Sequence, residues 1–390
     1  MRRSRIVGNH LSHGCAETRY AQKRRHRVTV ERLTVVRDAV LLSEYRSGEE
    51  ADTSAAVLDL SNNALPFAPL PSVRTAIADE VEHAAAYPAA AYGSLRSAIA
   101  RFTGCGTDQV VVGPGSVGVL AYLVRWVAGH GGRVVFAVPA FDAYERVVVG
   151  AGGIAVPVPG TPSRWQPLEA MVAAAGDDAA AILICAPHNP TGEQVGPDEV
   201  EMVLSRVPRN TVVVVDEAYI EFDRGNDPSA ILRMTRRHAN LVVLRTFSKA
   251  YGLAGLRVGY AVGHADLIGA CRTMAMPFGV NRLAVAAAVA SLEVVDELAA
   301  QVDSVVHARS MFIESIRGHG IDLPDSYGNF VWVPMRSPAP LVEHLAESGI
   351  AVRSYPDMGV RITVPAVEQI AEVVDVLADG YRRVEAISCR

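Results

Sequence analysis

Lysine is almost absent from this chain. Its 390 residues include 37 Lys and Arg together, and only two of these are Lys, Lys23 and Lys249, which leaves 35 Arg. A genome with little use for Lys would give the same scarcity without any function. However, a primary amine can lose its proton and attack a carbonyl to form an imine, which a guanidinium cannot do. Lys249 is therefore a candidate for covalent attachment of a carbonyl-bearing cofactor.

Cysteine pairs, long apolar runs and a strong net charge are also missing. The five cysteines are odd in number and scattered, with no Cys-x-x-Cys pair, which argues against a disulfide framework or a zinc site and for a reducing cytoplasm. No stretch reaches the roughly 20 apolar residues of a membrane span, so we expect a soluble protein. The net charge of −5 gives no nucleic-acid footprint.

The charge is uneven along the chain. Residues 1–37 carry ten Arg or Lys against Glu17 and Glu31, a balance of +8, which leaves −13 for the remainder. Such a segment is unlike one that packs into a core. The first residues hint at an export signal, but no apolar region follows them. We expect residues 1–30 to be a basic, disordered extension or the product of a start site assigned too early.

Alternation of strand-like and Ala-rich amphipathic segments predicts the fold. Such alternation is typical of an α/β protein with a doubly wound, mainly parallel sheet and helices on both faces. We expect residues 31–84 to belong to a smaller α+β domain, 85–294 to form the large domain, and 295–390 to complete the small one. The strand-like runs cover 110–113, 133–138, 181–186, 211–215, 241–245 and 258–262, with further strands at 329–333 and 360–364.

Three polar segments follow predicted strands of the large domain. Lys249 comes shortly after the apolar run 241–244, and Asp216 ends the run 211–215, which reads as a strand buried on both faces. A buried charge at that place requires a partner. Residues 110–120, VVVGPGSVGVL, read as a strand, a glycine turn and a helix start, where backbone N–H groups favour an anion such as phosphate. Ligands of α/β proteins bind at this edge of the sheet.

Segments in this order resemble the fold type I, pyridoxal-phosphate-dependent class II aminotransferases, and within them the histidinol-phosphate and aromatic-amino-acid aminotransferases. Residues 245–257, RTFSKAYGLAGLR, are similar to the cofactor-lysine signature of that family. Residues 186–192, APHNPTG, resemble its Pro-Asn-Asn-Pro-Thr-Gly loop with His188 replacing the first Asn. Residues 215–222, VDEAYIEF, resemble the strand end that meets the cofactor ring. The resemblance runs from about residue 57 to 377.

The resemblance implies a cofactor, pyridoxal 5′-phosphate, and a role for each matching residue. Lys249 would hold the cofactor and move the substrate proton, and Asp216 would keep the ring nitrogen protonated. Asn189 and Tyr219 match the residues that bind the phenolic oxygen. Phe141 falls where the family places an aromatic against the ring. The phosphate ligands would be Ser116, the amide of Val117, Thr246, Ser248 and Arg257.

Two arginines and two tyrosines are implied for the substrate and for a partner subunit. Arg361 matches the arginine that binds the substrate carboxylate, and Arg353 resembles a second one that faces the substrate side chain. Tyr87 resembles a tyrosine that reaches the cofactor phosphate of the neighbouring chain, and Tyr45 one that lines the neighbour's substrate pocket. The resemblance therefore implies a homodimer.

Departures from the family pattern occur at a few positions. Ala86 and Ala89 lack the charged flanks that the family places around Tyr87, and residues 61–63, SNN, stand where the family has Asn followed by Glu. Arg282 stands where small hydroxyl residues are usual, and it would change side-chain preference if it pointed into the pocket.

The activity implied is transfer of an amino group from an aromatic L-amino acid to a 2-oxo acid in two half-reactions. Residues 115–118, GSVG, are closer to the aromatic branch than to the histidinol-phosphate branch, which carries an acidic or amide pair there. A histidinol-phosphate aminotransferase and a threonine-phosphate-decarboxylase-like enzyme remain as alternatives. A transcription regulator with such a domain is the binding-module alternative, but residues 1–50 are too short for the winged helix it requires.

Overall fold

The computed structural model describes residues 58–89 and 91–388. The basic extension expected over 1–30 and the substrate residue expected at Tyr45 lie outside the described residues. In the described ranges, no helix combines the length and apolar character needed to cross a membrane.

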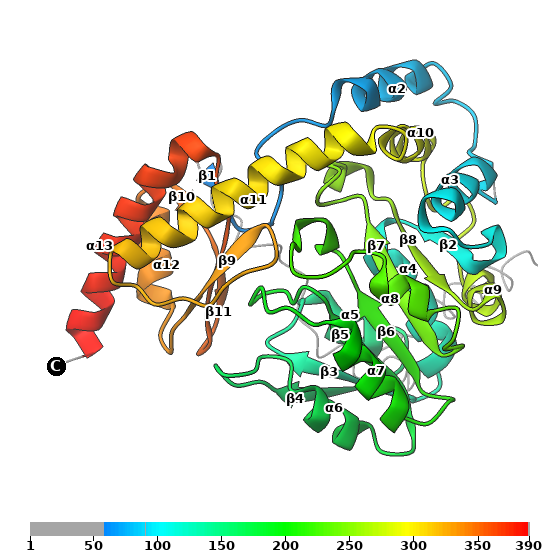
Figure 1. Ribbon diagram of the computed structural model, residues 1–390, viewed down its shortest axis with the longest axis horizontal. Helices are drawn as coiled ribbons and strands as arrows, with labels where there is room; N and C mark the ends of the chain where they lie inside the picture. Colours follow the sequence, from blue (N-terminus) through cyan, green and yellow to red (C-terminus); the bar gives the residue numbers. More distant parts are fainter. Residues whose placement is uncertain (1–57, 90, 389–390) are drawn as a thin grey trace, which may run out of the picture. The chain divides into compact units, whose positions relative to one another are not determined.

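A seven-stranded sheet forms the centre of the larger core (Figure 1). Its four neighbouring pairs from β4 to β7 are parallel, and β8 runs antiparallel to both of its neighbours. The prediction of a mainly parallel α/β sheet is therefore confirmed. In spatial order the strands are β2 (Val110–Gly113), β8 (Gly259–Gly263), β7 (Leu241–Thr246), β6 (Val212–Asp216), β5 (Ala179–Cys185), β3 (Arg133–Val138) and β4 (Ile154–Pro159).

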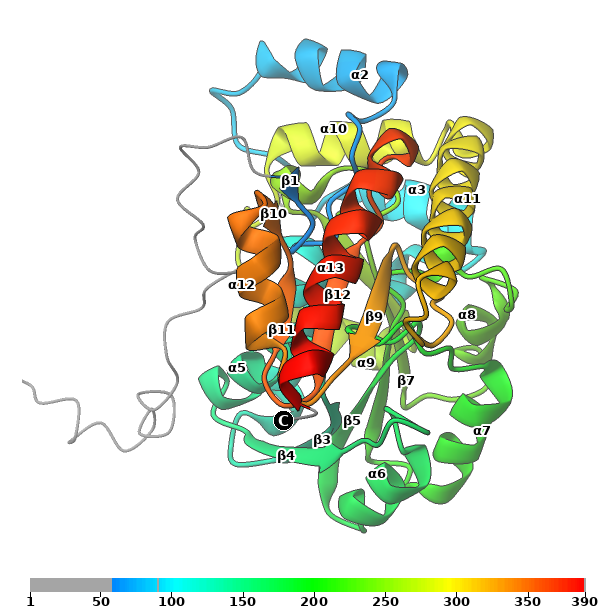
Figure 2. The ribbon, with the colours of Figure 1, turned by 90° about the vertical axis from the view of Figure 1, so that its left-hand side faces the viewer.

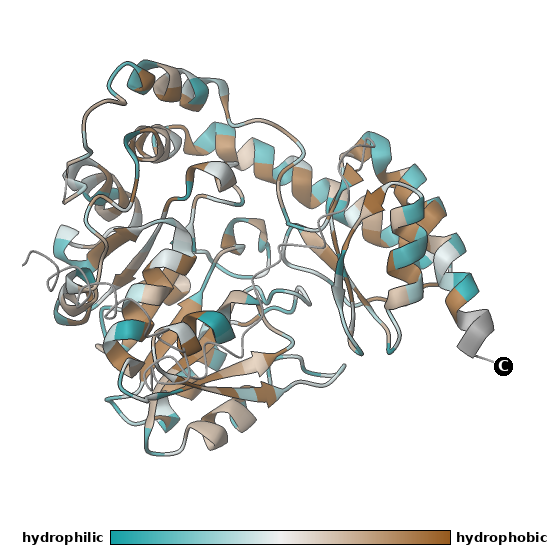
Figure 3. Ribbon diagram, turned by 180° about the vertical axis from the view of Figure 1, so that it is seen from behind, coloured by the Kyte–Doolittle hydropathy of each residue, from teal (hydrophilic) through white to brown (hydrophobic). Residues whose placement is uncertain are grey.

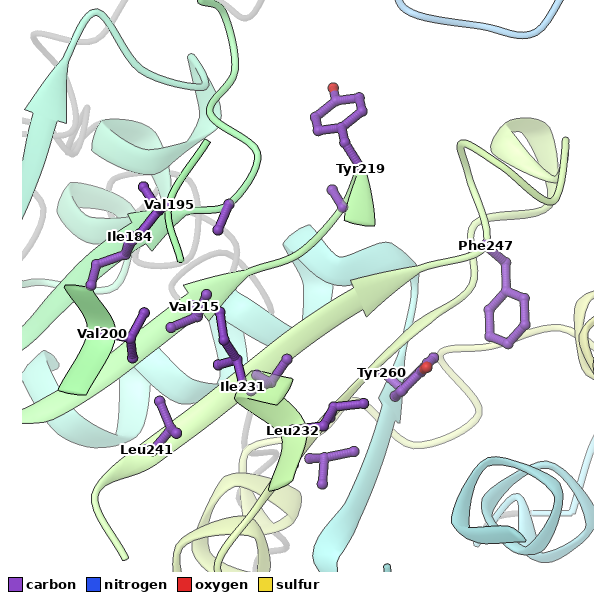
Figure 4. Close-up of a cluster of buried hydrophobic side chains, with 14 of the residues drawn as sticks. Ile184, Val195, Val200, Val215, Tyr219, Ile231, Leu232, Leu241, Phe247 and Tyr260 are labelled. Atoms are coloured by element: carbon purple, nitrogen blue, oxygen red, sulfur yellow. The ribbon is translucent and has the colours of Figure 1, made fainter. Parts of the chain in front are cut away.

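Helices cover both faces of this sheet because its central strands are apolar on both sides. In β6, Val213 and Val215 pack into one core cluster while Val212 and Val214 pack into another. Figure 3 shows the same strands as hydrophobic, and Figure 4 shows the first cluster around Val215 and Tyr260. One cluster includes α3 (Gly93–Thr103), α6 (Leu168–Ala175), α7 (Pro197–Arg206), α8 (Ala230–Met234) and α10 (Arg282–Ser291), and the other α4 (Gly115–Ala128), α5 (Ala143–Gly150) and α9 (Ala265–Thr273).

A second core surrounds a three-stranded antiparallel sheet in the order β11 (Arg353–Tyr355), β12 (Gly359–Thr363) and β9 (Phe330–Pro334). The strands expected near 329–333 and 360–364 are thus present with a shift of one residue. Beside it, β1 (Leu58–Asp59) pairs in parallel with β10 (Ile350–Ala351). Figure 2 shows α12 (Ala339–Glu347) and α13 (Ile370–Ser388) against this sheet, and their apolar side chains share one cluster with its strands.

Two helices connect or flank these cores. The first half of α11 (Val295–Gly318) contributes Leu298 and Val302 to the large core, and its second half contributes Phe312 to the small one. Val73 of α2 (Pro71–Val81) joins the large core. The division into domains at 84/85 and 294/295 remains a prediction. Short 3-10 turns occur at η4 (Thr107–Gln109), η5 (Ile220–Phe222), η6 (Ala254–Leu256) and η7 (Val367–Gln369).

Candidate active site

A cavity of about 530 Å³ lies where the carboxyl ends of the large sheet's strands meet the three-stranded sheet. The segments after β2, β3, β5, β6 and β7 contribute to its wall, as expected for the ligand edge of a parallel sheet. The structure brings together at this cavity twelve residues that the sequence singled out: Ser116, Val117, Phe141, Asn189, Asp216, Tyr219, Thr246, Ser248, Lys249, Arg257, Arg353 and Arg361.

Lys249 enters the cavity from the loop that follows β7. Its ammonium nitrogen Nζ donates hydrogen bonds to the carbonyl oxygens of Asn62 at 2.9 Å and Asn63 at 3.3 Å. Burial, together with the positive charges of Arg361 and Arg257, lowers the pKa of Lys249 to about 7. A large fraction of this amine is therefore neutral, and able to attack a carbonyl, at physiological pH.

Asp216 ends β6 and faces the same cavity with one oxygen unpaired. Its Oδ2 accepts a hydrogen bond of 2.9 Å from the buried hydroxyl of Tyr144, whereas Oδ1 is shielded from solvent and has no partner within the described residues. Burial raises the pKa of Asp216 to about 6, although the Tyr144 hydrogen bond opposes that shift. A buried acceptor without a donor is costly, so this oxygen fits a ligand N–H.

An anion-binding corner lies at the first turn of α4. Gly115 adopts φ +76°, a backbone conformation that favours glycine, and a Cβ there would come 2.5 Å from Nη2 of Arg257 and displace the guanidinium. Nη1 of Arg257 donates to Ser248 Oγ at 3.2 Å, and Thr246 Oγ1 donates to the same oxygen at 2.9 Å. A helix N-terminus, two hydroxyls and a guanidinium form a cluster of donors that suits a phosphate.

Arg361 of β12 also lines the cavity. It is 6% exposed, and its Nη1 donates to Asn189 Oδ1 at 2.6 Å while Nη2 donates to the carbonyl of Ser61. Its Nε has no hydrogen-bond partner within the described residues. The hydroxyl of Tyr219 accepts a hydrogen bond of 3.0 Å from Asn63 Nδ2. Arg361 thus presents a buried, fixed positive charge, which suits a carboxylate.

Two residues from the sequence analysis lie elsewhere. Arg282, the first residue of α10, does not line this cavity and forms an ion pair with Glu80 at 2.6 Å. It therefore does not contact a substrate side chain in the cavity of its own chain. The side chain of Tyr87 is 78% exposed and packs against Phe278, 4.8 Å between ring centroids. Its role toward a partner's cofactor stays a prediction.

Sequence reasoning missed three residues at or near the cavity. Tyr144 holds Asp216, Asn63 holds Tyr219, and Asp142 forms an ion pair with Arg353. Tyr144 follows Phe141 by three residues at the start of α5, so helical spacing could have placed both near the strand edge. Nothing in the local sequence marks Asn63, because its partner Tyr219 is 156 residues away.

The arrangement of these residues fits pyridoxal 5′-phosphate. The unpaired Oδ1 of Asp216 suits the ring N–H, the corner at Gly115, Ser248 and Arg257 suits the phosphate, and the amine of Lys249 suits the carbonyl carbon.

Comparison with known proteins gives consistent matches over most of the chain. The family model "Aminotransferase class I and II" matches residues 55–377. An aromatic amino acid aminotransferase of Mycobacterium bovis (strain BCG / Pasteur 1173P2) is 42% identical over 320 residues, which cover 81% of this chain and 90% of that protein. One of Rhodococcus opacus (strain B4) is 42% identical over 308 residues, covering 79% and 86%. Among solved structures, histidinol-phosphate aminotransferase from Sinorhizobium meliloti in complex with pyridoxal-5′-phosphate superposes with a TM-score of 0.82 at 26% identity, covering 89% of this chain and 97% of that one.

Proposed function

The chain belongs to the aminotransferase class I and II family and is a pyridoxal-phosphate-dependent aminotransferase, and on this basis we propose that it moves the amino group of an aromatic L-amino acid to a 2-oxo acid by a ping-pong mechanism. Relatives named for aromatic amino acids at 42% identity support this substrate class.

The observation that carries the proposal is that Lys249, the unpaired oxygen of Asp216 and the guanidinium of Arg361 face one cavity. Bound pyridoxal 5′-phosphate withdraws electrons from the substrate Cα when its ring nitrogen is protonated. Asp216 holds that proton in place, and Tyr144 orients Asp216. Lys249, with its lowered pKa, removes the Cα proton and would deliver it to the cofactor carbon that carried the carbonyl.

The remaining residues bind and orient. Arg361 binds the substrate carboxylate, which fixes the Cα proton near Lys249. Asn189 and Tyr219 would hold the phenolic oxygen, and Phe141 would provide an apolar face for the ring. The residues that would hold the phosphate are Ser116, the amide of Val117, Thr246, Ser248 and Arg257. Arg353 lines the same cavity and faces the substrate side chain.

Histidinol phosphate is the second candidate substrate. It is favoured by Arg353, a guanidinium at the cavity wall, and by the structural similarity to an enzyme named for that substrate. We rank it second because Arg353 is already paired with the carboxylate of Asp142. A dianionic phosphate requires several matched donors to compensate its desolvation.

A cytoplasmic homodimer is part of the same proposal. The exposed Tyr87 packs beside Phe278, which is 44% exposed, and two aromatic side chains on one surface suit a subunit contact. The cysteines of the described ranges, Cys105, Cys185 and Cys271, are free thiols, which suits a reducing compartment.

Single-turnover spectroscopy tests the proposal. The protein loaded with cofactor is mixed with each of a panel of L-amino acids in the absence of a 2-oxo acid, and the cofactor absorbance and the keto product are measured. Phenylalanine and tyrosine should convert the cofactor to its amino form with one equivalent of 2-oxo acid per site. Release of carbon dioxide instead of a 2-oxo acid would contradict the assignment.

A further inference from the structure

An ion pair between Asp142 and Arg353 forms part of the cavity wall. Asp142 follows Phe141 at the start of α5, and Arg353 begins β11, so the pair joins the edge of the large sheet to the three-stranded sheet. The two side chains are 29% and 19% exposed. Asp142 accepts no capping hydrogen bond at the start of α5, so its carboxylate is directed to Arg353 and not to its own helix.

The register of the small sheet places this pair beside the proposed carboxylate site. Arg353 and Arg361 are direct partners in the antiparallel pair β11–β12. Direct partners project from the same face of a sheet with Cβ atoms about 5 Å apart. An amino acid whose carboxylate binds Arg361 therefore has its side chain within reach of Arg353. This step rests on the proposed function.

Each charged side chain of the cavity can be assigned to a ligand group or to a residue of opposite charge. Among the described residues that line the cavity, the cationic ones are Lys249, Arg257, Arg353 and Arg361, and the acidic ones are Asp142 and Asp216. Under the proposed function, Arg257 serves the phosphate, Arg361 the substrate carboxylate and Asp216 the ring nitrogen. The charge of Arg353 remains, and Asp142 compensates it.

We propose that Asp142 is a specificity-determining residue that excludes substrates with an anionic side chain. By compensating Arg353, it makes the side-chain end of the cavity neutral, which favours an uncharged aromatic ring over a phosphate or a second carboxylate. An anionic side chain brought to this place meets the Asp142 carboxylate, and like charges at close range oppose binding. Specificity here comes from repulsion of the wrong substrate.

Four proteins test this inference: wild type, Asp142→Asn, Arg353→Gln and the double variant. For each, kcat/KM is measured for phenylalanine, aspartate and histidinol phosphate. Asp142→Asn should raise the ratio of anionic to aromatic efficiency at least tenfold, and the double variant should lose most of that gain. Because the ratio compares substrates on one preparation, a smaller active fraction does not affect it, and Asp142→Ser provides a second substitution.

Ligand binding supplies a readout that does not depend on turnover. Calorimetry on the cofactor-loaded proteins compares succinate with 3-phenylpropanoate, neither of which can be transaminated. Asp142→Asn should bind succinate at least tenfold more tightly and 3-phenylpropanoate unchanged within about threefold.

An unchanged substrate ratio and unchanged succinate affinity in Asp142→Asn and Asp142→Ser would overturn the role of Asp142, whichever substrate the wild type prefers. A wild type that prefers histidinol phosphate to phenylalanine would overturn the proposed function instead. The two failures are therefore distinct.

Discussion

Burial and neighbouring charge determine how single residues of the site react. The amine of Lys249 faces two guanidiniums, and the carboxyl of Asp216 ends a fully buried strand. Both environments disfavour the charged form, so the pKa of Lys249 is lowered to about 7 and that of Asp216 is raised to about 6. Under the proposed function, a bound ring N–H would supply the partner that Oδ1 of Asp216 lacks among the described residues.

Replacing Lys249 tests its chemistry apart from its charge. Lys249→Ala and Lys249→Arg should both abolish amino transfer, by more than a thousandfold, because neither offers a neutral amine. Circular dichroism should show an intact fold, since the Lys249 ammonium bonds only to two loop carbonyls among the described residues. Substantial transamination by either variant would remove Lys249 from the mechanism.

The lowered pKa of Lys249 predicts a pH dependence. The neutral fraction of its amine rises with pH and reaches half at about 7, so the rate at which the apoprotein attaches the cofactor should rise with pH and level off above about 8. An ordinary lysine would keep accelerating to about pH 10.4. Stopped-flow absorbance measures this rate.

Two variants test whether the charge of Arg361 contributes to the lowered pKa of Lys249. Arg361→Gln should raise the pH at which the rate of cofactor attachment is half-maximal, because the positive charge of Arg361 contributes to the lowered pKa of Lys249. Arg125→Gln, on the exposed side of α4, should leave it in place. A midpoint near 10 in the wild type would show that Lys249 is not desolvated as described.

At the scale of elements, most strands of the large sheet could be predicted from the sequence. The contacts between side chains of different elements could be predicted only in part. The runs 110–113, 133–138 and 241–245 match β2, β3 and β7 because these strands are buried on both faces and are therefore continuous apolar runs. β4 (Ile154–Pro159) was missed, since its exposed residues and two prolines resemble a loop.

Site residues on the ends of strands followed from the sequence, because parallel strands deliver their carboxyl ends to one edge. The partners of those residues did not. Asp142 meets Arg353 across 211 residues, and Asn63 meets Thr363 across 300, and no local pattern records such contacts. The sequence left open whether Arg282 points into the cavity, and the structure shows it paired with Glu80 instead.

Tyr144 of α5 donates a hydrogen bond to Asp216 of β6, and replacing it tests whether a contact between two elements orients the site. Tyr144→Phe removes the hydrogen bond to Asp216, a bond to a charged group worth about 1.5–3 kcal/mol. Since that bond lowers the pKa of Asp216, its loss should raise this pKa further. Cofactor affinity should then fall about tenfold, and more at pH 6 than at pH 8, because a protonated Asp216 cannot hold the ring proton.

Cofactor titration monitored by absorbance measures the effect. Tyr122→Phe, on α4 and outside the cavity, is the control. Equal affinity of wild type and Tyr144→Phe at both pH values would remove Tyr144 from its orienting role.

At the scale of the whole molecule, the proposed homodimer makes Tyr87 act on the partner's site. Mixing refolded Lys249→Ala and Tyr87→Ala chains should then restore activity above that of either variant, because a hybrid dimer contains one site with both Lys249 and the partner's Tyr87 intact. About a quarter of all sites should be intact in an equal mixture with random pairing.

The control mixes Lys249→Ala with Arg361→Ala. These two residues line the cavity of one chain, so every site of the hybrid remains defective and no activity should return. Analytical ultracentrifugation of the wild type should show a dimer. An active monomer, or an absence of complementation by Tyr87→Ala, would contradict the shared site.

The central claim is that the cavity selects an aromatic amino acid. Its most direct test is the comparison of kcat/KM for phenylalanine and for histidinol phosphate on one preparation of the wild-type enzyme with the same 2-oxo acid. We predict a higher value for phenylalanine. A tenfold preference for histidinol phosphate, equivalent to about 1.4 kcal/mol in transition-state binding, would contradict the account.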